Sequence, residues 1–467
     1  MAATSSRRSR RCVPLLACLT IFALQSPPTF GQVSEPQAPG TGLPEQPPAL
    51  PEVPPPKYDF EHNITGDWFG LRSSLSDQGL ELTGGYAMEF LGDPVGGQKQ
   101  GQTYVHNILL QGDADLEKLI GLPDSAFRVR FSQRSGDSLS KHFIGNAFSV
   151  QQLYGGGQTY RLVEMQMYHS LFDDQLNLTY GRLSATDDFL TSPLYCQFVS
   201  NAICGQPAAP FFNMPNGITA YPGATWGARA RYTFPFETYW MVGVYDGDPE
   251  HGDPVLHESS NDHGTNFSFG DNGVLVLSEA GYTPQEGLLG LPGHYKVGGY
   301  YHSGDFHNVS RDVNGDNRFT TGLAGRSFSG NNGYYTLLDQ MLYREQPEGD
   351  EGLYGFFVFI LAPDQRHNVF PYFTSAGLVY QGLLDFRPED KTALGIANGW
   401  FSDKIRNAQH RAGVEKQSTE TILELNHQIQ ITPAIYVRPD LQYVIKPNGF
   451  SDIDDALVIG FEAGITF

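Results

Sequence analysis

Residues 457–467 have the sequence Leu-Val-Ile-Gly-Phe-Glu-Ala-Gly-Ile-Thr-Phe and end the chain. Every second side chain from Leu457 to Phe467 is apolar or aromatic, whereas Glu462 and Thr466 fall in the other phase. Because successive side chains of a β-strand point to opposite faces, this segment predicts a strand with one apolar face.

The same alternation recurs in segments of about ten residues along the chain, which is typical of an outer-membrane β-barrel. These segments begin at Leu80, Phe127, Leu176, Trp226 and Val274. A soluble β-sandwich also alternates, but here one face carries few charges, Tyr and Phe cluster near strand ends, and the last residue is Phe. After the first thirty residues no apolar run reaches ~18 residues, so we expect strands rather than helices to cross the membrane.

The chain length sets the expected size of the barrel. Residues 80–467 number 388, which gives about sixteen strands at roughly 24 residues per strand with its share of turn or loop. A barrel of about eight strands is filled by its own side chains, whereas about sixteen strands leave an aqueous channel. We therefore predict an all-β chain: a transmembrane antiparallel β-barrel of about sixteen strands over 80–467, with an N-terminal periplasmic extension and a short helix.

Three segments precede the predicted barrel. Four arginines between Arg7 and Arg11 followed by the apolar stretch 13–24 predict a secretory signal peptide over 1–31. Residues 32–57 are rich in proline and predict an extended periplasmic spacer. Trp68, Leu71 and Leu75 recur at helical spacing, so we expect a short amphipathic helix within 58–79.

The composition excludes one class of partner. Charged residues make up 17% of the 467 residues, and the formal net charge is −21. Nucleic-acid binding is not expected, because a phosphate backbone is held by clustered Lys and Arg. The run Phe-Phe-Val-Phe-Ile-Leu-Ala at 356–362 is apolar on both faces. It fits a strand that packs on an internal plug or on another subunit, and equally an ordinary strand with a crowded inner face.

The chain resembles the carbohydrate-selective, OprB-type porins from about Ile64 to Phe467. The resemblance is carried by Gly-Asp-Trp-Phe-Gly-Leu-Arg at 66–72 with Gly79, Tyr-Gly-Arg-Leu at 180–183 followed by 187–189, Gly-Val-Tyr-Asp-Gly-Asp-Pro at 243–249, Glu-Ala-Gly-Tyr at 279–282, Asp-Gln-Met-Leu-Tyr-Arg-Glu at 339–345, and segments 376–383, 387–390, 439–443 and 447–449. Asp246 departs from the Asn often found there. The resemblance implies a passive channel for glucose and related sugars in the outer membrane of a Gram-negative bacterium, with lipid around it. It leaves a monomer and a homotrimer both open.

A sugar-selective pore needs polar groups that replace the hydrogen bonds of water to the sugar hydroxyls. In-strand arginines should point inward, because a charge on the lipid face costs up to ~2–4 kcal/mol at the midplane. The candidate pore-lining residues are Arg128, Arg130, Arg134, Arg182, Arg229 and Arg231, with Glu164 and Glu279 among the opposing acids. Glu81, Glu89 and Glu424 are further acids of this kind. The alternative is a structural network in the lumen that never contacts solute.

Two smaller features have their own interpretations. Cys196 and Cys204 are the pair left after the signal peptide, and they predict a disulfide in one loop. Asp312 and Asp316 imitate the opening of a calcium loop, but the sixth and twelfth positions are Asn317 and Leu323, so a solvated loop is the better interpretation. No cofactor is expected.

Three other functions compete with a sugar-permeable porin. The first is a general or cation-preferring diffusion porin, and the second is a surface adhesin or lectin. The third is a barrel hydrolase, for which Asp187 and Asp188 would supply carboxylates. Being adjacent, they would point opposite ways on a strand and could not act as a pair. The sequence also lacks a Gly-x-Ser-x-Gly motif, so no enzyme activity is predicted.

Overall fold

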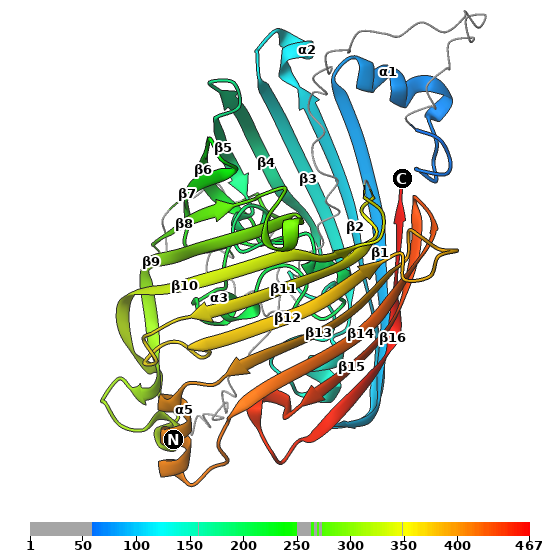
Figure 1. Ribbon diagram of the computed structural model, residues 1–467. Coiled ribbons are helices and arrows are strands. Elements are labelled where there is room, and N and C mark those ends of the chain that lie inside the picture. The colour runs from blue at the N-terminus through cyan, green and yellow to red at the C-terminus, as the bar shows by residue number, and fades with distance from the viewer. Residues whose placement is uncertain (1–57, 157, 250–262, 266–268, 270–272, 348) are drawn as a thin grey trace, which may run out of the picture.

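The computed structural model describes residues 58–467 apart from 157, 250–262, 266–268, 270–272 and 348, and these residues form one closed antiparallel barrel of sixteen strands (Figure 1). The strands are β1 Leu80–Gly97, β2 Gly101–Asp115, β3 Ser125–Gly136, β4 Tyr160–Leu171, β5 Leu176–Leu183, β6 Thr225–Phe234, β7 Thr238–Asp246, β8 Val274–Tyr282, β9 Gly293–Asp312, β10 Gly325–Arg344, β11 Gly352–Leu361, β12 Tyr372–Gln381, β13 Lys391–Trp400, β14 Thr419–Thr432, β15 Ile435–Ile445 and β16 Asp454–Thr466. The predicted fold class is confirmed. The predicted signal peptide and spacer, 1–31 and 32–57, lie outside the described residues.

The first and last strands close the barrel. β1 pairs with β16 in an antiparallel register that includes Gly85 opposite Thr466 and Phe90 opposite Phe461. Each strand also pairs with its neighbour in sequence. Closure removes the open edges that a sheet in lipid cannot leave unpaired.

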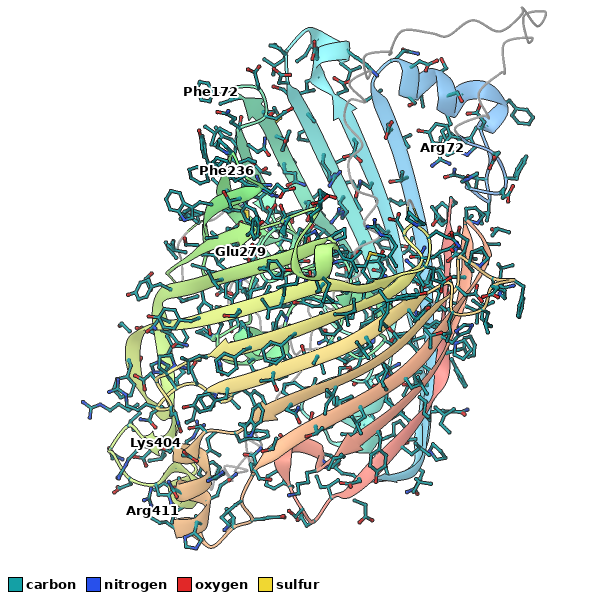
Figure 2. The ribbon with its side chains drawn as sticks, viewed as in Figure 1. Arg72, Phe172, Phe236, Glu279, Lys404 and Arg411 are labelled. Carbon is teal, nitrogen blue, oxygen red and sulfur yellow. A yellow bond between two sulfur atoms is a disulfide. The ribbon has the colours of Figure 1, made fainter. Side chains whose placement is uncertain are left out.

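The outer wall is apolar, as the alternation predicts. In β16, Ile459 and Phe461 are exposed outward while Val458 and Glu462 are buried inside. Exposed aromatic residues lie near the strand ends, among them Phe172 and Phe236, which Figure 2 labels on the left margin of the barrel. Aromatic residues at these levels match the two membrane interfaces. Within the described residues, none of the helices is long and apolar enough to cross a membrane.

The two ends of the barrel differ. We call the end that carries the C-terminus, α2 (Leu116–Ile120) and the connections 172–175 and 235–237 the turn end. We call the opposite end, which carries the longer connections with α4 (Arg318–Thr321) and α5 (Asp403–Ala412), the loop end. Both are visible in Figure 1.

The segment before β1 is tied to the seam of the barrel at the turn end. It contains a 3-10 turn, Trp68–Gly70, followed by α1, Leu71–Asp77, which lies within the predicted helical segment 58–79. The buried Arg72 donates hydrogen bonds to the carbonyl oxygens of Leu82 at 2.7 Å and Phe467 at 3.4 Å. Trp68 and Leu71 remain exposed, so the apolar face predicted for this helix does not pack against the barrel.

Two loops fold from the loop end into the barrel and form its hydrophobic core. They comprise residues 137–159 and 184–224, the second of which includes α3 (Ala208–Phe212). Figure 1 shows this chain inside the ring of strands. The sixteen-strand count predicts an aqueous channel, and the two loops occupy part of that lumen. Strand counting misses them because it assigns every connection to the outside.

Glycines on the inner wall make room for the inserted aromatic rings. A Cβ atom at Gly395 would lie 2.6 Å from the Phe198 ring, and one at Gly399 would lie 2.3 Å from the Phe148 ring. Both distances are shorter than a Cβ atom tolerates, so the rings pack directly on the backbone of β13. Some of the 53 glycines of the chain therefore serve packing between loop and wall.

The apolar run at 356–362 belongs to this same packing. Phe356 points inward, with its ring centroid 5.3 Å from that of Tyr195 and 5.7 Å from that of Phe198. Phe357 and Phe359 are exposed on the outer wall. Of the interpretations left open, the strand that packs on an internal element is the one found.

An arginine on the outer wall should destabilise the barrel much more than the same change outside it. Leu425 in β14 and Val414 after α5 are 46% and 47% exposed. We expect Leu425→Arg to lower the free energy of unfolding in lipid vesicles by up to ~2–4 kcal/mol, because the guanidinium enters hydrocarbon. Val414→Arg is the matched control and should change it by less than ~0.5 kcal/mol. Urea titrations in vesicles measure both values, and equal costs would mean that β14 does not face lipid.

Candidate functional site

A cluster of arginines and carboxylates lies on the inner wall of β2–β6. The β3 arginines point inward, as the strand phase predicts. Arg128 Nε lies 2.6 Å from Asp113 Oδ1 on β2, and the two side chains are 34% and 29% exposed. This pair therefore reaches the space inside the barrel. The sequence analysis did not single out Asp113, although its place opposite Arg128 in the β2–β3 register would have indicated it.

Arg130 is the centre of the cluster. Its Nη1 lies 3.2 Å from Glu164 Oε2 on β4 and donates to Asp187 Oδ2 at 3.0 Å, while Nε donates to Gln111 Oε1 at 2.9 Å. Glu164 is buried, but Asp187 is partly exposed. Arg130 thus joins the wall to the inserted loop 184–224.

A second wall–loop pair forms beside the first. Arg229 Nη2 on β6 donates to Asp188 Oδ1 at 2.7 Å. Our premise that Asp187 and Asp188 stand on a strand is wrong, because Asp187 ends a 3-10 turn, Ala185–Asp187, in the inserted loop and Asp188 follows it. Each carboxylate therefore meets a different wall arginine. Arg231 stacks over the ring of Tyr239, with Cζ 4.1 Å from the ring centroid.

The structure places the other predicted arginines away from the space inside the barrel. Arg134 is buried, and its Nε donates to Asn107 Oδ1 at 3.3 Å while its guanidinium lies 5.1 Å from the Tyr221 ring. Arg182 is fully buried, and its Nε donates to the carbonyl oxygen of Leu162 at 3.2 Å. Both side chains are buried, as the alternative of a structural network in the lumen describes, and their contact with a solute stays a prediction.

Glu279 on β8 is also buried and holds loop 184–224 in place. It accepts hydrogen bonds from the hydroxyls of Tyr239 at 2.6 Å and Tyr335 at 3.0 Å, and from the backbone N–H of Leu190 at 3.4 Å. Its place in the structure is that of an anchor for the loop.

The comparisons with known proteins agree with this architecture. The family model described as the carbohydrate-selective porin, OprB family, matches residues 99–467. The chain belongs to the OprB family. Porin B of Pseudomonas aeruginosa is 30% identical over 428 residues, which cover 86% of this chain and 91% of that protein. The structure described as the high-pH structure of Pseudomonas putida OprB is 29% identical, with a TM-score of 0.79 over 88% of this chain and 99% of the other.

Membership of the OprB family confirms the predicted class of protein. The chain is an outer-membrane porin, and members of this family are channels rather than enzymes, so the barrel hydrolase is excluded. In this porin the inner wall also binds the two inserted loops.

Buried carboxylates on the wall of the porin anchor both loops by their backbone. Glu420 accepts hydrogen bonds from the N–H groups of Ala147 and Phe148, both at 2.7 Å. Glu424 accepts from those of Val199 at 2.6 Å and Ser200 at 2.9 Å. The alternation had marked Glu424 as an inward acid but gave no indication of its partners, because they lie more than 200 residues away.

Two further wall carboxylates bind loop 137–159. Glu89 on β1 accepts a hydrogen bond from the N–H of Leu153 at 3.2 Å. Glu462 on β16 accepts from Gln152 Nε2 at 2.6 Å and from Arg438 Nη1 at 2.9 Å. The loop is therefore fixed to both strands of the closing seam.

Two smaller predictions can be placed in the porin structure. Cys196 and Cys204 form a disulfide within loop 184–224. Asp312 Oδ1 accepts hydrogen bonds from the N–H groups of Asn314 and Asp316, and Oδ2 accepts one from the Thr321 hydroxyl. Within the described ranges, no group of three His, Cys, Asp or Glu residues is arranged to hold a metal.

Removing one wall anchor should loosen the loop that it holds. Glu424→Ala leaves the N–H groups of Val199 and Ser200 without their acceptor, at a cost of ~1–3 kcal/mol for each buried donor. We expect larger fluctuations of the open-channel current and a changed mean conductance in single-channel recordings. Glu389→Ala, at an exposed glutamate of the turn end, is the control. If the current fluctuations and the mean conductance of Glu424→Ala are unchanged, this anchor does not determine the conductance of the channel.

Proposed function

We propose that sugars diffuse passively through this porin past the cluster formed by Asp113, Arg128, Arg130, Asp187 and Arg229 with its partner Asp188. The observation that carries the proposal is the joint exposure of guanidinium and carboxylate groups in this cluster. Arg128, Asp113, Asp187 and Asp188 are all about a quarter to a third exposed. The OprB family membership gives the solute class.

The chemistry of the cluster suits a sugar. Each sugar hydroxyl is both a donor and an acceptor, so it can donate to the carboxylates of Asp187 and Asp188 and accept from the guanidinium of Arg128. Hydrogen bonds to charged groups are stronger than those between neutral groups. A passing sugar can therefore exchange its water for these groups at little net cost.

The pairing of the charges favours a neutral solute over an ion. Arg128 is paired with Asp113, Arg130 with Glu164 and Asp187, and Arg229 with Asp188. Each of these four carboxylates has an arginine partner, whereas a cation-preferring pore would require acids without one. One chain is sufficient for the proposed diffusion path, because its sixteen strands form a closed barrel.

The same proposal includes the orientation of the barrel. Short turns on the periplasmic side and longer loops outside are the rule for such barrels. We place the turn end, with the N-terminal segment, in the periplasm, and the loop end with α5 at the cell surface.

Removing the two β3 arginines of the cluster should reduce sugar binding in the pore. In the Arg128→Ala, Arg130→Ala double variant we expect glucose to block the ion current with about tenfold weaker affinity, because charge-assisted hydrogen bonds are lost. Arg128→Gln alone is a milder variant that keeps Arg130 beside Glu164. Arg411→Ala on the exposed face of α5 is the control. Unchanged block and unchanged glucose-driven swelling of liposomes would point to a general diffusion porin.

A pair of single cysteines tests the orientation. Lys404 on α5 and Glu389 at the turn end are both exposed. A membrane-impermeant maleimide should label Lys404→Cys on intact cells and label Glu389→Cys only after the outer membrane is permeabilised. The reverse pattern would invert the orientation.

A further inference from the structure

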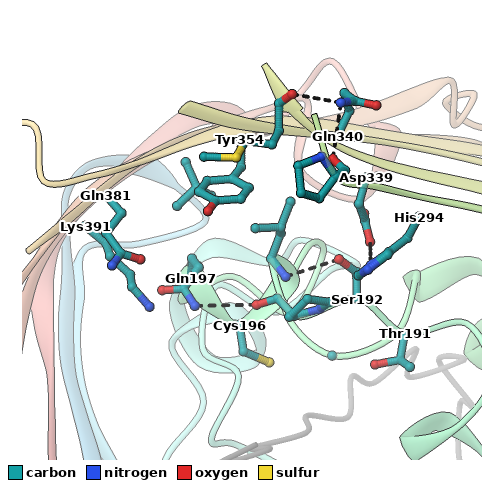
Figure 3. A pocket seen from close by; sticks show the side chains of 17 residues that line it. Thr191, Ser192, Cys196, Gln197, His294, Asp339, Gln340, Tyr354, Gln381 and Lys391 are labelled. Atoms are coloured by element: carbon teal, nitrogen blue, oxygen red, sulfur yellow. Dashed lines mark hydrogen bonds and ion pairs between the residues drawn. The ribbon is translucent and has the colours of Figure 1, made fainter. Parts of the chain in front are cut away.

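A pocket of 370 Å³ lies at the turn end, between loop 184–224 and the inner wall of β9–β13 (Figure 3). The loop contributes the stretch from Thr191 to Leu194 and Gln197. The wall contributes the ends of the strands, including His294, Asp339, Tyr354 and Lys391. Its volume falls within the ~300–1,000 Å³ typical of small-molecule sites. The pocket shares no lining residue with the arginine cluster described above.

Asp339 gives the pocket an unsatisfied acceptor. This β10 residue is 5% exposed and lines the pocket. Its Oδ2 lies 3.7 Å from His294 Nδ1, and among the described residues no group donates a hydrogen bond to either carboxylate oxygen. A buried carboxylate without donors is costly, so the site favours a ligand that brings donors.

The other lining groups define the ligand further. Gln197 Oε1 is a second buried acceptor without a donor among the described residues. Lys391 lines the same pocket, and its ammonium group opposes the binding of a cation. Tyr354 and Val379 supply apolar surface. Acceptors, an ammonium group and an aromatic ring together match a neutral polyhydroxyl compound, whose hydroxyls donate and whose C–H faces pack on the ring.

We propose that this pocket is a second saccharide-binding subsite of the porin, on the turn-end side of the arginine cluster, in which Asp339 accepts hydrogen bonds from sugar hydroxyls. The inference rests on the proposed function, because it assumes that sugars reach the lumen. Asp339 and Gln197 are the acceptors of the subsite, and Lys391 is its donor.

His294 controls access to the carboxylate. Its ring contacts Asp339 at the edge of the pocket (Figure 3), and its side chain is 42% exposed. A ring this exposed is free to turn toward solvent, and the carboxylate then faces the pocket. His294 therefore competes with the sugar for Asp339. Removing its ring strengthens sugar binding, whereas removing the charge of Asp339 weakens it.

The test measures the glucose concentration that blocks half of the ion current through single channels in planar bilayers. Asp339→Asn keeps the shape of the side chain and should raise this concentration about tenfold. His294→Ala should lower it by about twofold to fivefold, since the His294 ring no longer competes for Asp339. Asp385→Asn makes the same change at an exposed turn-end carboxylate and should leave it unchanged. The native fold of each variant is checked by its heat-dependent mobility on a gel.

Each result has a defined meaning. Opposite shifts in the Asp339 and His294 variants support the subsite, and the His294 variant decides alone if Asp339→Asn does not fold. Normal glucose-driven swelling of liposomes with unchanged block in both variants overturns the subsite and leaves the proposed function intact. If Asp339→Asn alters the reversal potential in a KCl gradient but not the block by glucose, the pocket holds a cation and the inference is wrong. If the native protein shows neither swelling nor block, the proposed function itself fails.

Discussion

The closing of β1 onto β16 is the constraint on which the rest of the structure depends. In hydrocarbon an unpaired backbone group costs several kcal/mol, so the last strand of the sheet has to pair with the first. The last residue takes part in this closure, because Phe467 and Gly84 exchange two backbone hydrogen bonds of 2.9 Å. Arg72 then binds the same carbonyl oxygen of Phe467 from outside the sheet. The seam is thus fixed by residues nearly 400 positions apart, and shortening the chain by one residue would remove part of it.

Closure creates a second requirement inside the barrel. Two loops enter the lumen, and their N–H groups lose contact with bulk water, so each needs an acceptor there. The wall supplies carboxylates, which accept two such bonds at once, as Glu420 and Glu424 do. Several acids that the strand phase places in the lumen therefore serve the loops and not a solute. In this porin, many acidic side chains that point into the lumen indicate that loops are inserted there.

The strands and their phase could be predicted from the sequence because they depend on local alternation. The inward direction of Arg128 and Arg130 follows from that phase alone. The loop partners of Arg130 and Arg229 could not be predicted, since Asp187 and Asp188 reach them only through a loop that turns back into the barrel. The same limit applies to Arg182 and Arg134, which the phase directs inward and which are buried in the structure. The phase of a strand specifies which side chains lie on the inner face of the barrel. Whether such a side chain contacts a solute depends on what else fills the lumen.

Loop 184–224 connects the two polar regions of the lumen. Asp187 and Asp188 meet the wall arginines, and the pocket begins only three residues later at Thr191. Between them the N–H of Leu190 is held by Glu279, and the carbonyl oxygen of Thr191 accepts a 2.8 Å hydrogen bond from Lys296 Nζ. These two contacts fix the loop on β8 and β9 between the cluster and the pocket. The spacing of the two polar regions is therefore set by the wall, and the buried Glu279 affects any solute through the position of the loop rather than by contact.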